Sequence, residues 1–233
     1  MAMEPFLAMT AAEIRNISGF PGKIAWMACH FSPFGLGLSN LPKALPAGSV
    51  LIVDDITPPH RHDPVFIAEQ LSSCVEMLQC CGVLLDFQRS GYDETRVIAQ
   101  HLLTALPCPV AVSDPFAKDL DCPVFLPPVP PSAALETHIA PWEGREIWLE
   151  ISLEGEVLTL TENGCAITSL PYPDLDTQGF EDPKLHCHYR IEVNEKSARF
   201  TLWRTKYDIS KLLEKATRLG ITTTIGLYQE LQT

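Results

Sequence analysis

A short apolar segment of the sequence ends in polar side chains that could contact a ligand. The segment Gly82–Gln88 carries three aliphatic residues and then Asp86, Phe87 and Gln88. Because alternate side chains of a strand lie on one face, Asp86 and Gln88 are expected to point the same way. An ionised carboxylate that follows three apolar residues must be paired or face a wet cavity. The segment therefore predicts a buried strand whose carboxyl end faces a pocket.

Other aspartates occupy equivalent places after apolar runs. Asp55 follows the run Ser49–Asp54, and Asp114 follows the run Pro109–Ser113. In barrel enzymes the functional residues lie at the carboxyl ends of the strands, so these side chains are expected to converge with Asp86. Converging carboxylates could accept hydrogen bonds from sugar hydroxyls or hold a divalent cation. Each aspartate also fits a loop residue that caps a helix or starts a turn.

Two further groups of residues suggest ligand contacts. Trp142, next to Pro141, is predicted to be exposed and could stack on a sugar ring. His60 and His62 follow the run that ends in Asp54, and with that aspartate they could bind a zinc-like ion that activates water. Both histidines also fit exposed positions of a proline-rich loop. A metal-dependent hydrolase thus stands as an alternative to a sugar-binding site.

The order of the expected elements indicates an α/β fold. Short apolar runs without strict alternation are typical of strands covered on both faces, and amphipathic patterns between them predict helices. Alternating strands and helices favour a parallel sheet with right-handed crossovers, as a barrel or as a doubly wound sheet. The expected strands are 24–30, 49–54, 82–86, 109–113, 123–126 and 221–226, and the expected helices are 11–17, 65–78, 93–106 and 208–219.

The C-terminal half has a different pattern. From about residue 146 to 200 the apolar residues alternate more regularly and Asn163-Gly164 predicts a turn, which is typical of antiparallel strands. A hairpin of 188–193 and 198–203 is expected within this region. No linker separates the two halves, so residues 1–233 are interpreted as one barrel-like domain with a β-rich insertion at about 146–200.

The segments in this order resemble glycoside hydrolase family 18, the chitinase-like TIM barrels. Cys81–Gln88 is similar to the family's D-G-x-D-x-D-x-E strand, and Phe200–Ile221 is similar to its final strand, helix and entry to the last strand. The resemblance implies a (β/α)₈ barrel. With 233 residues the chain is somewhat shorter than the roughly 250 that are typical, so a compact or incomplete barrel with short or absent helices is expected.

The resemblance also implies an impaired site. Asp86 and Gln88 occupy the family's catalytic positions, where the second residue is ordinarily the glutamic acid that protonates the glycosidic oxygen. An amide cannot deliver that proton. Leu84 and Cys81 replace two further aspartates of the motif, and the aromatic platform of the last strand falls near Thr224. The predicted function is a catalytically impaired barrel that binds a carbohydrate or glycan-derived ligand, with no cofactor. A structural or assembly protein with a vestigial pocket is a further alternative.

The composition of the chain narrows the kinds of partner and the cellular location that can be expected. A net charge of −12 without a lysine or arginine cluster disfavours nucleic acid and anionic membranes as partners. The sequence contains no apolar run long enough to cross a bilayer and no basic leader, and its eight cysteines fit reduced thiols in apolar surroundings. These features predict a cytoplasmic protein that takes a small-molecule or glycan ligand, whereas they leave the oligomeric state open.

Overall fold

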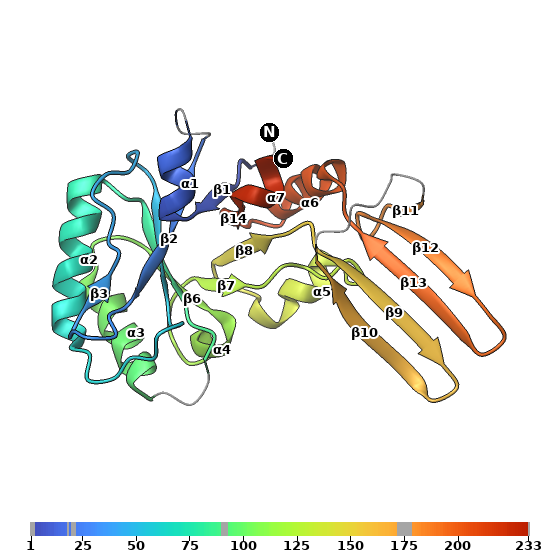
Figure 1. Ribbon diagram of the computed structural model, residues 1–233, viewed down its shortest axis with the longest axis horizontal. Helices are drawn as coiled ribbons and strands as arrows, with labels where there is room; N and C mark the ends of the chain where they lie inside the picture. Colours follow the sequence, from blue (N-terminus) through green and yellow to red (C-terminus); the bar gives the residue numbers. More distant parts are fainter. Residues whose placement is uncertain (1–2, 18, 20–21, 90–92, 172–178, 233) are drawn as a thin grey trace.

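Eight parallel strands form a closed barrel in the computed structural model, which describes all residues except 1–2, 18, 20–21, 90–92, 172–178 and 233 (Figure 1). The barrel closes where β1 pairs in parallel with both β2 and β14. A short β3 (Leu38–Ser39) adds antiparallel to the end of β2. The predicted TIM-type barrel is therefore confirmed. Its strands are β1 (Phe6–Met9), β2 (Ile24–Phe31), β4 (Val50–Asp54), β5 (Gly82–Asp86), β6 (Val110–Ser113), β7 (Val124–Leu126), β8 (Ile147–Ile151) and β14 (Thr223–Leu227).

The helices around the barrel are unequal. Only α2 (Pro64–Leu78), α3 (Asp93–Ala105) and α6 (Lys206–Arg218) exceed six residues among the described helices. The connection from β2 to β4 contains β3 and no helix. The expectation of short or absent helices is confirmed. The short helices are α1 (Ala11–Asn16), α4 (Asp114–Ala117), α5 (Leu135–Ile139), the 3₁₀ helix η1 (Ala140–Trp142) and α7 (Tyr228–Gln232).

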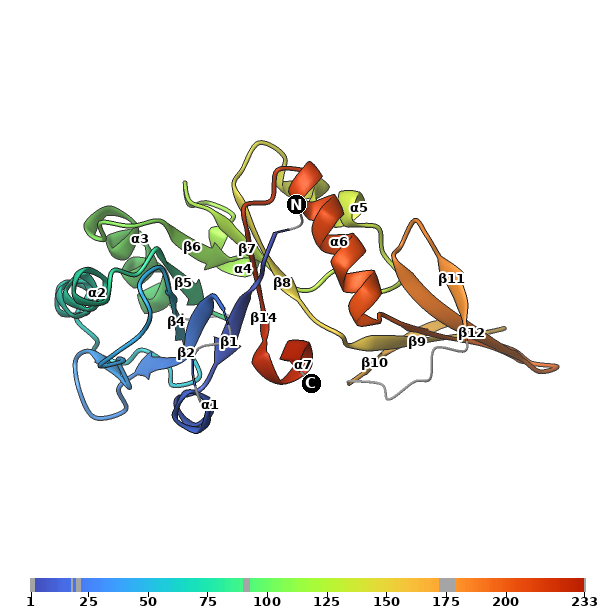
Figure 2. The same cartoon turned by 90° about the horizontal axis from the view of Figure 1, so that it is seen from above.

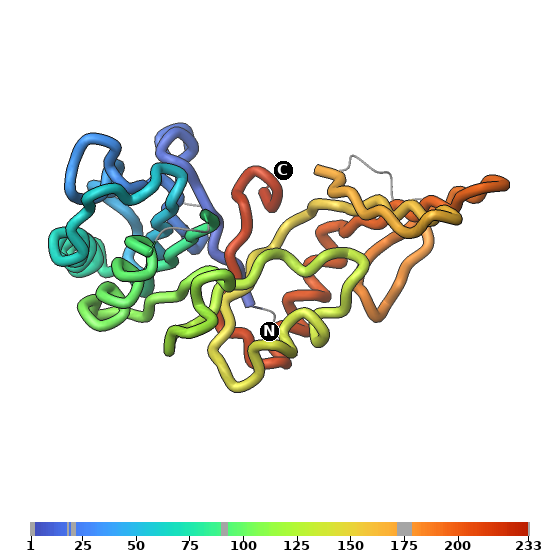
Figure 3. Tube along the Cα trace, turned by 90° about the horizontal axis from the view of Figure 1, so that it is seen from below, coloured from blue at the N-terminus to red at the C-terminus, as the bar shows by residue number. Residues whose placement is uncertain are grey.

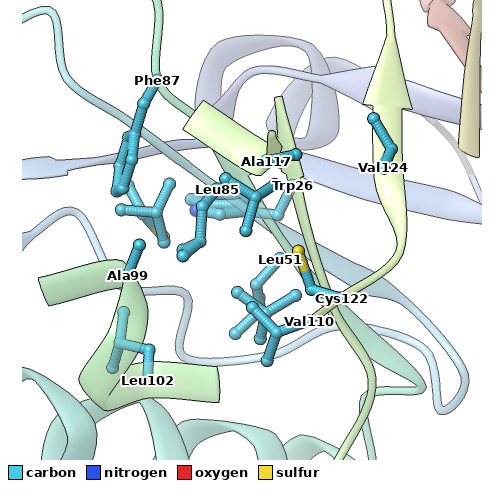
Figure 4. Close-up of a cluster of buried hydrophobic side chains, with 14 of the residues drawn as sticks. Trp26, Leu51, Leu85, Phe87, Ala99, Leu102, Val110, Ala117, Cys122 and Val124 are labelled. Atoms are coloured by element: carbon cyan, nitrogen blue, oxygen red, sulfur yellow. The ribbon is translucent and has the colours of Figure 1, made fainter. Parts of the chain in front are cut away.

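Two layers of apolar side chains hold the barrel together. One layer fills the space between the strands and the helices, where Leu85 and Phe87 lie near Ala99 and Leu102 of α3 (Figure 4). The second layer fills the barrel interior and includes Ile52, Leu84 and Trp148. Apolar side chains on both faces explain the continuous apolar runs of the strands.

A glycine makes room for the largest interior side chain. A Cβ atom at Gly82 would lie 2.7 Å from Cη2 of Trp148, which is closer than van der Waals contact allows. Gly82 is thus required by packing at the base of β5. This packing helps to position the strand that ends at Asp86, two residues before Gln88.

A separate antiparallel sheet, called sheet B here, follows β8 and precedes α6. Within the described residues it comprises five strands in the order β10-β9-β13-β12-β11. Their bounds are β9 (Gly155–Thr161), β10 (Gly164–Leu170), β11 (Phe180–Asp182), β12 (Cys187–Val193) and β13 (Ser197–Trp203). Figure 3 shows the barrel and sheet B at opposite ends of an elongated molecule.

The sequence placed the start of the antiparallel region too early. Ile147–Ile151 is the barrel strand β8, which pairs in parallel with β7 and β14. The segment looked alternating because Glu150 interrupts an otherwise apolar strand, and this glutamate faces the pocket described below. Phe6–Met9 at the other end of the chain was missed as β1, because four residues give too short a pattern to predict a strand.

Within the described part of the chain, no helix has both the length and the apolar composition needed to cross a bilayer.

Candidate functional site

A pocket of about 280 Å³ lies at the carboxyl ends of the barrel strands. Its apolar wall continues the packed barrel interior, and its polar side chains stand at or just after strand ends. This is where barrel enzymes place their functional groups. The apolar residues are Ala8, Met27, Ile52, Ile56, Leu84, Phe125, Ile225, Gly226 and Leu227, and the polar residues are Asp54, Asp55, Asp86, Gln88, Arg89 and Glu150.

Strand β5 directs alternate residues into this pocket. Leu84, Asp86 and Gln88 line it, whereas Leu85 and Phe87 point into the layer beneath the helices. Nε2 of Gln88 donates a short hydrogen bond to Oδ1 of Asp86. Asp86 and Gln88 thus face the same pocket, and the amide is a hydrogen-bond partner of the carboxylate. The amide occupies one acceptor site of the carboxylate and offers no acidic proton.

Asp55 fixes the backbone that follows β5. Its side chain is buried, and its Oδ1 and Oδ2 accept the backbone N–H groups of Gln88 and Arg89, each at 2.9 Å. From the other side, Oγ of Ser113 accepts the N–H of Phe87 at 3.0 Å and donates to the carbonyl of Phe87. The segment that carries Gln88 is therefore held by two strands. Asp55 lines the pocket, but both of its carboxylate oxygens accept backbone N–H groups and so position the segment after β5.

Asp54 pairs with a histidine from the neighbouring strand. Oδ2 of Asp54 lies 2.7 Å from Nδ1 of His30, and Oδ1 accepts the backbone N–H of Ile56 at 3.0 Å. In the parallel register Asp54 stands opposite Asp86 of β5. The carboxylates of β4 and β5 therefore form one edge of the pocket.

Glu150 of β8 adds a carboxyl group with altered proton affinity. Burial raises its pKa to about 7, with further contributions from the negative charges of Asp86, Glu230 and Glu154. The pKa of Asp86 is also raised, first by burial and then by Asp54 and Asp55, while the Gln88 amide opposes the shift. A carboxyl with a pKa near 7 can donate or accept a proton at neutral pH.

The site predicted from the sequence includes neither Glu150 nor Arg89. The available signal for Glu150 was a charged residue inside an apolar run, the same signal that identified Asp86. It was overlooked because the run was taken as part of an antiparallel, half-exposed region.

Two predicted ligand contacts lie outside this pocket. Asp114 begins α4 after β6, and burial raises its pKa while His138 opposes the shift. Trp142 ends η1, before the amino end of β8, and Cζ of Arg145 lies 5.5 Å from its ring centre. Neither side chain lines the pocket. The predicted set is thus brought together at Asp55, Asp86 and Gln88, and not at Asp114 and Trp142.

The alternative metal site is not assembled. Among the residues that the structure describes, no three histidine, cysteine, aspartate or glutamate side chains are placed to hold a metal ion. Nε2 of His62 lies 3.1 Å from the carbonyl oxygen of Ser32, and the imidazole packs edge-on against Phe31. Asp54 pairs with His30 instead. The loop of His60 and His62 therefore gives no support to a metal-dependent hydrolase.

The last strand gives the pocket an aliphatic wall. Thr224 is fully buried and is not among the pocket residues, whereas Ile225 and Leu227 of β14 line the pocket. A strand presents alternate residues to one face, so the resemblance placed the platform one residue from the pocket-facing position. No aromatic ring from β14 is available there.

No family model and no curated protein sequence matches the chain. Several solved structures do match the chain. A chitinase from Chromobacterium violaceum matches with a TM-score of 0.55 and 11% identity over 96% of this chain and 93% of that one. The protein ydhD of Bacillus subtilis, designated a sporulation-specific glycosylase, matches with a TM-score of 0.54 and 8% identity over 87% and 89%.

A third match is the spore cortex-lytic enzyme SleL of Bacillus cereus, with a TM-score of 0.51 and 11% identity over 88% of this chain. This chain spans only 63% of that enzyme. At such identities the likeness concerns the fold. The predicted resemblance to chitinase-like barrels is confirmed at that level.

Proposed function

We propose that this barrel binds a carbohydrate or glycan-derived ligand at the mouth of its pocket and lacks the hydrolysis typical of chitinase-like barrels. The observation that carries the proposal is the Asp86–Gln88 hydrogen bond within the pocket. It places an amide where a proton donor would be needed, yet it leaves an ordered donor and acceptor pair. The shared fold with a chitinase, a glycosylase and a cortex-lytic enzyme supports the ligand class.

The pocket lining suits a sugar ring. Apolar side chains such as Phe125, Ile52 and Ile225 form a wall that can cover the C–H face of a ring. Carboxylates at the rim can accept hydrogen bonds from hydroxyl or amide groups, and the exposed Gln88 and Arg89 can donate. Small-molecule sites commonly combine a mostly apolar wall with a few placed polar groups.

Rigidity is a further reason to favour binding. Asp55 and Ser113 hold the backbone on both sides of Phe87, so the Gln88 segment need not be ordered when a ligand arrives. A site whose polar groups are already in place loses less free energy on binding. The ordered pocket can therefore favour ligand binding even though Gln88 replaces the catalytic glutamic acid.

Binding is tested by isothermal titration calorimetry with chitooligosaccharides and with soluble peptidoglycan fragments. We expect saturable binding to one of these classes and at least about 10-fold weaker binding for Asp86→Leu, which removes the central acceptor. Glu76→Gln on the exposed surface of α2 is the matched control and should bind as the wild type does. Absence of binding by the wild type to both classes would reject the proposal in favour of a vestigial pocket.

Hydrolysis is tested separately on the same ligands by mass spectrometry of the products. The wild type is expected to release no cleaved sugar, and Gln88→Glu is expected to produce only weak cleavage because Leu84 remains apolar. Turnover by the wild type that Glu150→Gln abolishes would contradict the proposal. In that case Glu150 would be the proton donor.

A further inference from the structure

Sheet B sorts its side chains by polarity onto two faces. In the antiparallel register, Leu158 stands opposite Ile167 on β10 and opposite Phe200 on β13, and Phe200 stands opposite Ile191 on β12. Residues in register share a face, so these four side chains form a continuous apolar row across the sheet. The row above it contains Leu160, and Val193 opposite Ala198. We call this surface the apolar face of sheet B.

The opposite face is mostly polar. Thr168, Thr201 and Arg190 lie beside the buried Val157 in the row that alternates with the apolar one. Charged residues of β13 and β12 stand opposite each other in the next row, at Arg199 and Glu192. An antiparallel sheet that is polar on one face and apolar on the other normally covers the apolar face with a core. The pattern of sheet B is therefore that of half a sandwich.

The apolar face is exposed over most of its area. Ile167 is 58% exposed, Ile191 45% and Val193 75%. Figures 1 and 2 show why: sheet B extends away from the barrel, and the turns that join β9 to β10 and β12 to β13 lie at its far end. At the base of the sheet, next to the barrel, Leu202 and Trp203 are buried.

We propose that the apolar face of sheet B binds the same face of a second copy of this chain, giving a symmetric dimer. The first argument is size. The four seven-residue strands β9, β10, β12 and β13, ~4.8 Å apart and rising ~3.4 Å per residue, cover roughly 450 Å² in flat projection. Protruding side chains raise the accessible area above this value. A standard interface buries about 800 Å² on each partner, so this face supplies most of one side.

The second argument is chemical. The exposed residues of the apolar face include Leu160, Ile167, Ile191 and Val193. The carboxylate on this face, Glu156, stands opposite the buried Leu202 at the base of the sheet and accepts the backbone N–H of Ser132. The complement of the exposed part is therefore another uncharged apolar surface. A sugar would find few hydrogen-bonding groups there. An anionic membrane would be repelled by the net charge of −12. The apolar face of a second copy of the chain is such a surface, and it has the same size.

The third argument is geometrical. Two twisted antiparallel sheets pack face to face at about −30° with interdigitating side chains. Two copies of one sheet have the same twist, so a two-fold axis through the apolar face matches each residue to its partner. The arrangement closes on itself and leaves the barrel pockets outside the interface. The dimer is thus independent of the proposed ligand binding.

Two neighbouring residues of β10 provide a matched test. Ile167 lies on the apolar face and Thr168 on the polar face, and both belong to the edge strand of the sheet. By analytical ultracentrifugation at physiological ionic strength we expect a wild-type dimer. Ile167→Lys should weaken dimerisation roughly 100-fold because it buries an unpaired charge in the interface. Thr168→Lys should remain a dimer, and circular dichroism of both variants checks that they fold.

Thiol alkylation gives a second measurement that does not depend on the variants. Cys165 lies on the apolar face, opposite Leu160, and is exposed, and Cys81 is exposed on the barrel. Raising the protein concentration through the dimer transition should slow the alkylation of Cys165 and leave that of Cys81 unchanged. A wild type that stays monomeric at high concentration, or equal dissociation by the two lysine variants, would overturn the proposal.

Discussion

The barrel mouth and sheet B depart from ordinary burial in opposite directions. At the mouth, carboxyl groups are buried beside an apolar wall, and the pKa values of Asp86 and Glu150 rise as a result. On sheet B, large apolar side chains such as Ile167 and Val193 are exposed. Either departure costs free energy in the isolated chain. Both departures lie where we propose contacts, with a polar ligand at the barrel mouth and with an apolar partner on sheet B.

The largest expected effect is a difference between the barrel and sheet B in how much a truncated side chain lowers the free energy of unfolding. Leu85→Ala removes a fully buried side chain from the layer beneath α3 and should lower the free energy of unfolding by about 3 kcal/mol. Leu160→Ala on sheet B removes a side chain that is 42% exposed, so a loss under about 1 kcal/mol is expected for the monomer. Urea denaturation at low protein concentration measures both. Equal losses would show that the apolar face is covered within the monomer.

The next effect tests whether the pocket is rigid because of Asp55. Asp55→Ala leaves two backbone N–H groups without their acceptor and should cost about 2–3 kcal/mol. Asp119→Ala breaks the exposed pair with Arg96 and should cost under about 1 kcal/mol. The measurement is again urea denaturation, followed by hydrogen exchange at Gln88 and Arg89. If their protection is unchanged in Asp55→Ala, Asp55 does not hold the segment.

The sequence predicted most barrel strands because their apolar runs are covered on both faces. The predictions for 82–86, 109–113 and 123–126 agree with the structure to within one residue at each end. They failed where a strand was too short, as at Phe6–Met9, or where one charged side chain changed the pattern, as at Glu150 in β8. Periodicity reports which face is buried and cannot tell a pocket-facing glutamate from a solvent-facing one.

The candidate site shows the same limit. Asp55, Asp86 and Gln88 were predicted because parallel strands bring their carboxyl ends to one edge. Asp114 also follows a strand, but the chain turns at once into α4, and Ser113 rather than Asp114 contacts the β5 segment. The hydrogen bonds that give Asp55 a positioning role join residues more than thirty positions apart, and the sequence contains no local trace of them.

The third effect is the pH dependence that Glu150 imposes on the stability of the barrel. The pKa of Glu150 is about 7 in the folded protein, against an ordinary value of 4.5. Between these two values the folded state holds more protons than the unfolded state, so the free energy of unfolding falls as pH rises through this window. Glu150→Gln removes the titrating group. Its free energy of unfolding should exceed that of the wild type by up to about 3 kcal/mol above pH 7 and match it below pH 4.5.

Glu162→Gln, in the turn between β9 and β10 of sheet B, is the matched control, since Glu162 is exposed. Its stability should follow the wild type at every pH. Because the negative charge of Asp86 contributes to the raised pKa of Glu150, Asp86→Asn should reduce the stability that Glu150→Gln adds when the two substitutions are combined. If the free energy of unfolding changes with pH equally in the wild type and in Glu150→Gln, Glu150 is hydrated in solution. Its carboxyl group would then titrate like an exposed carboxyl group of sheet B.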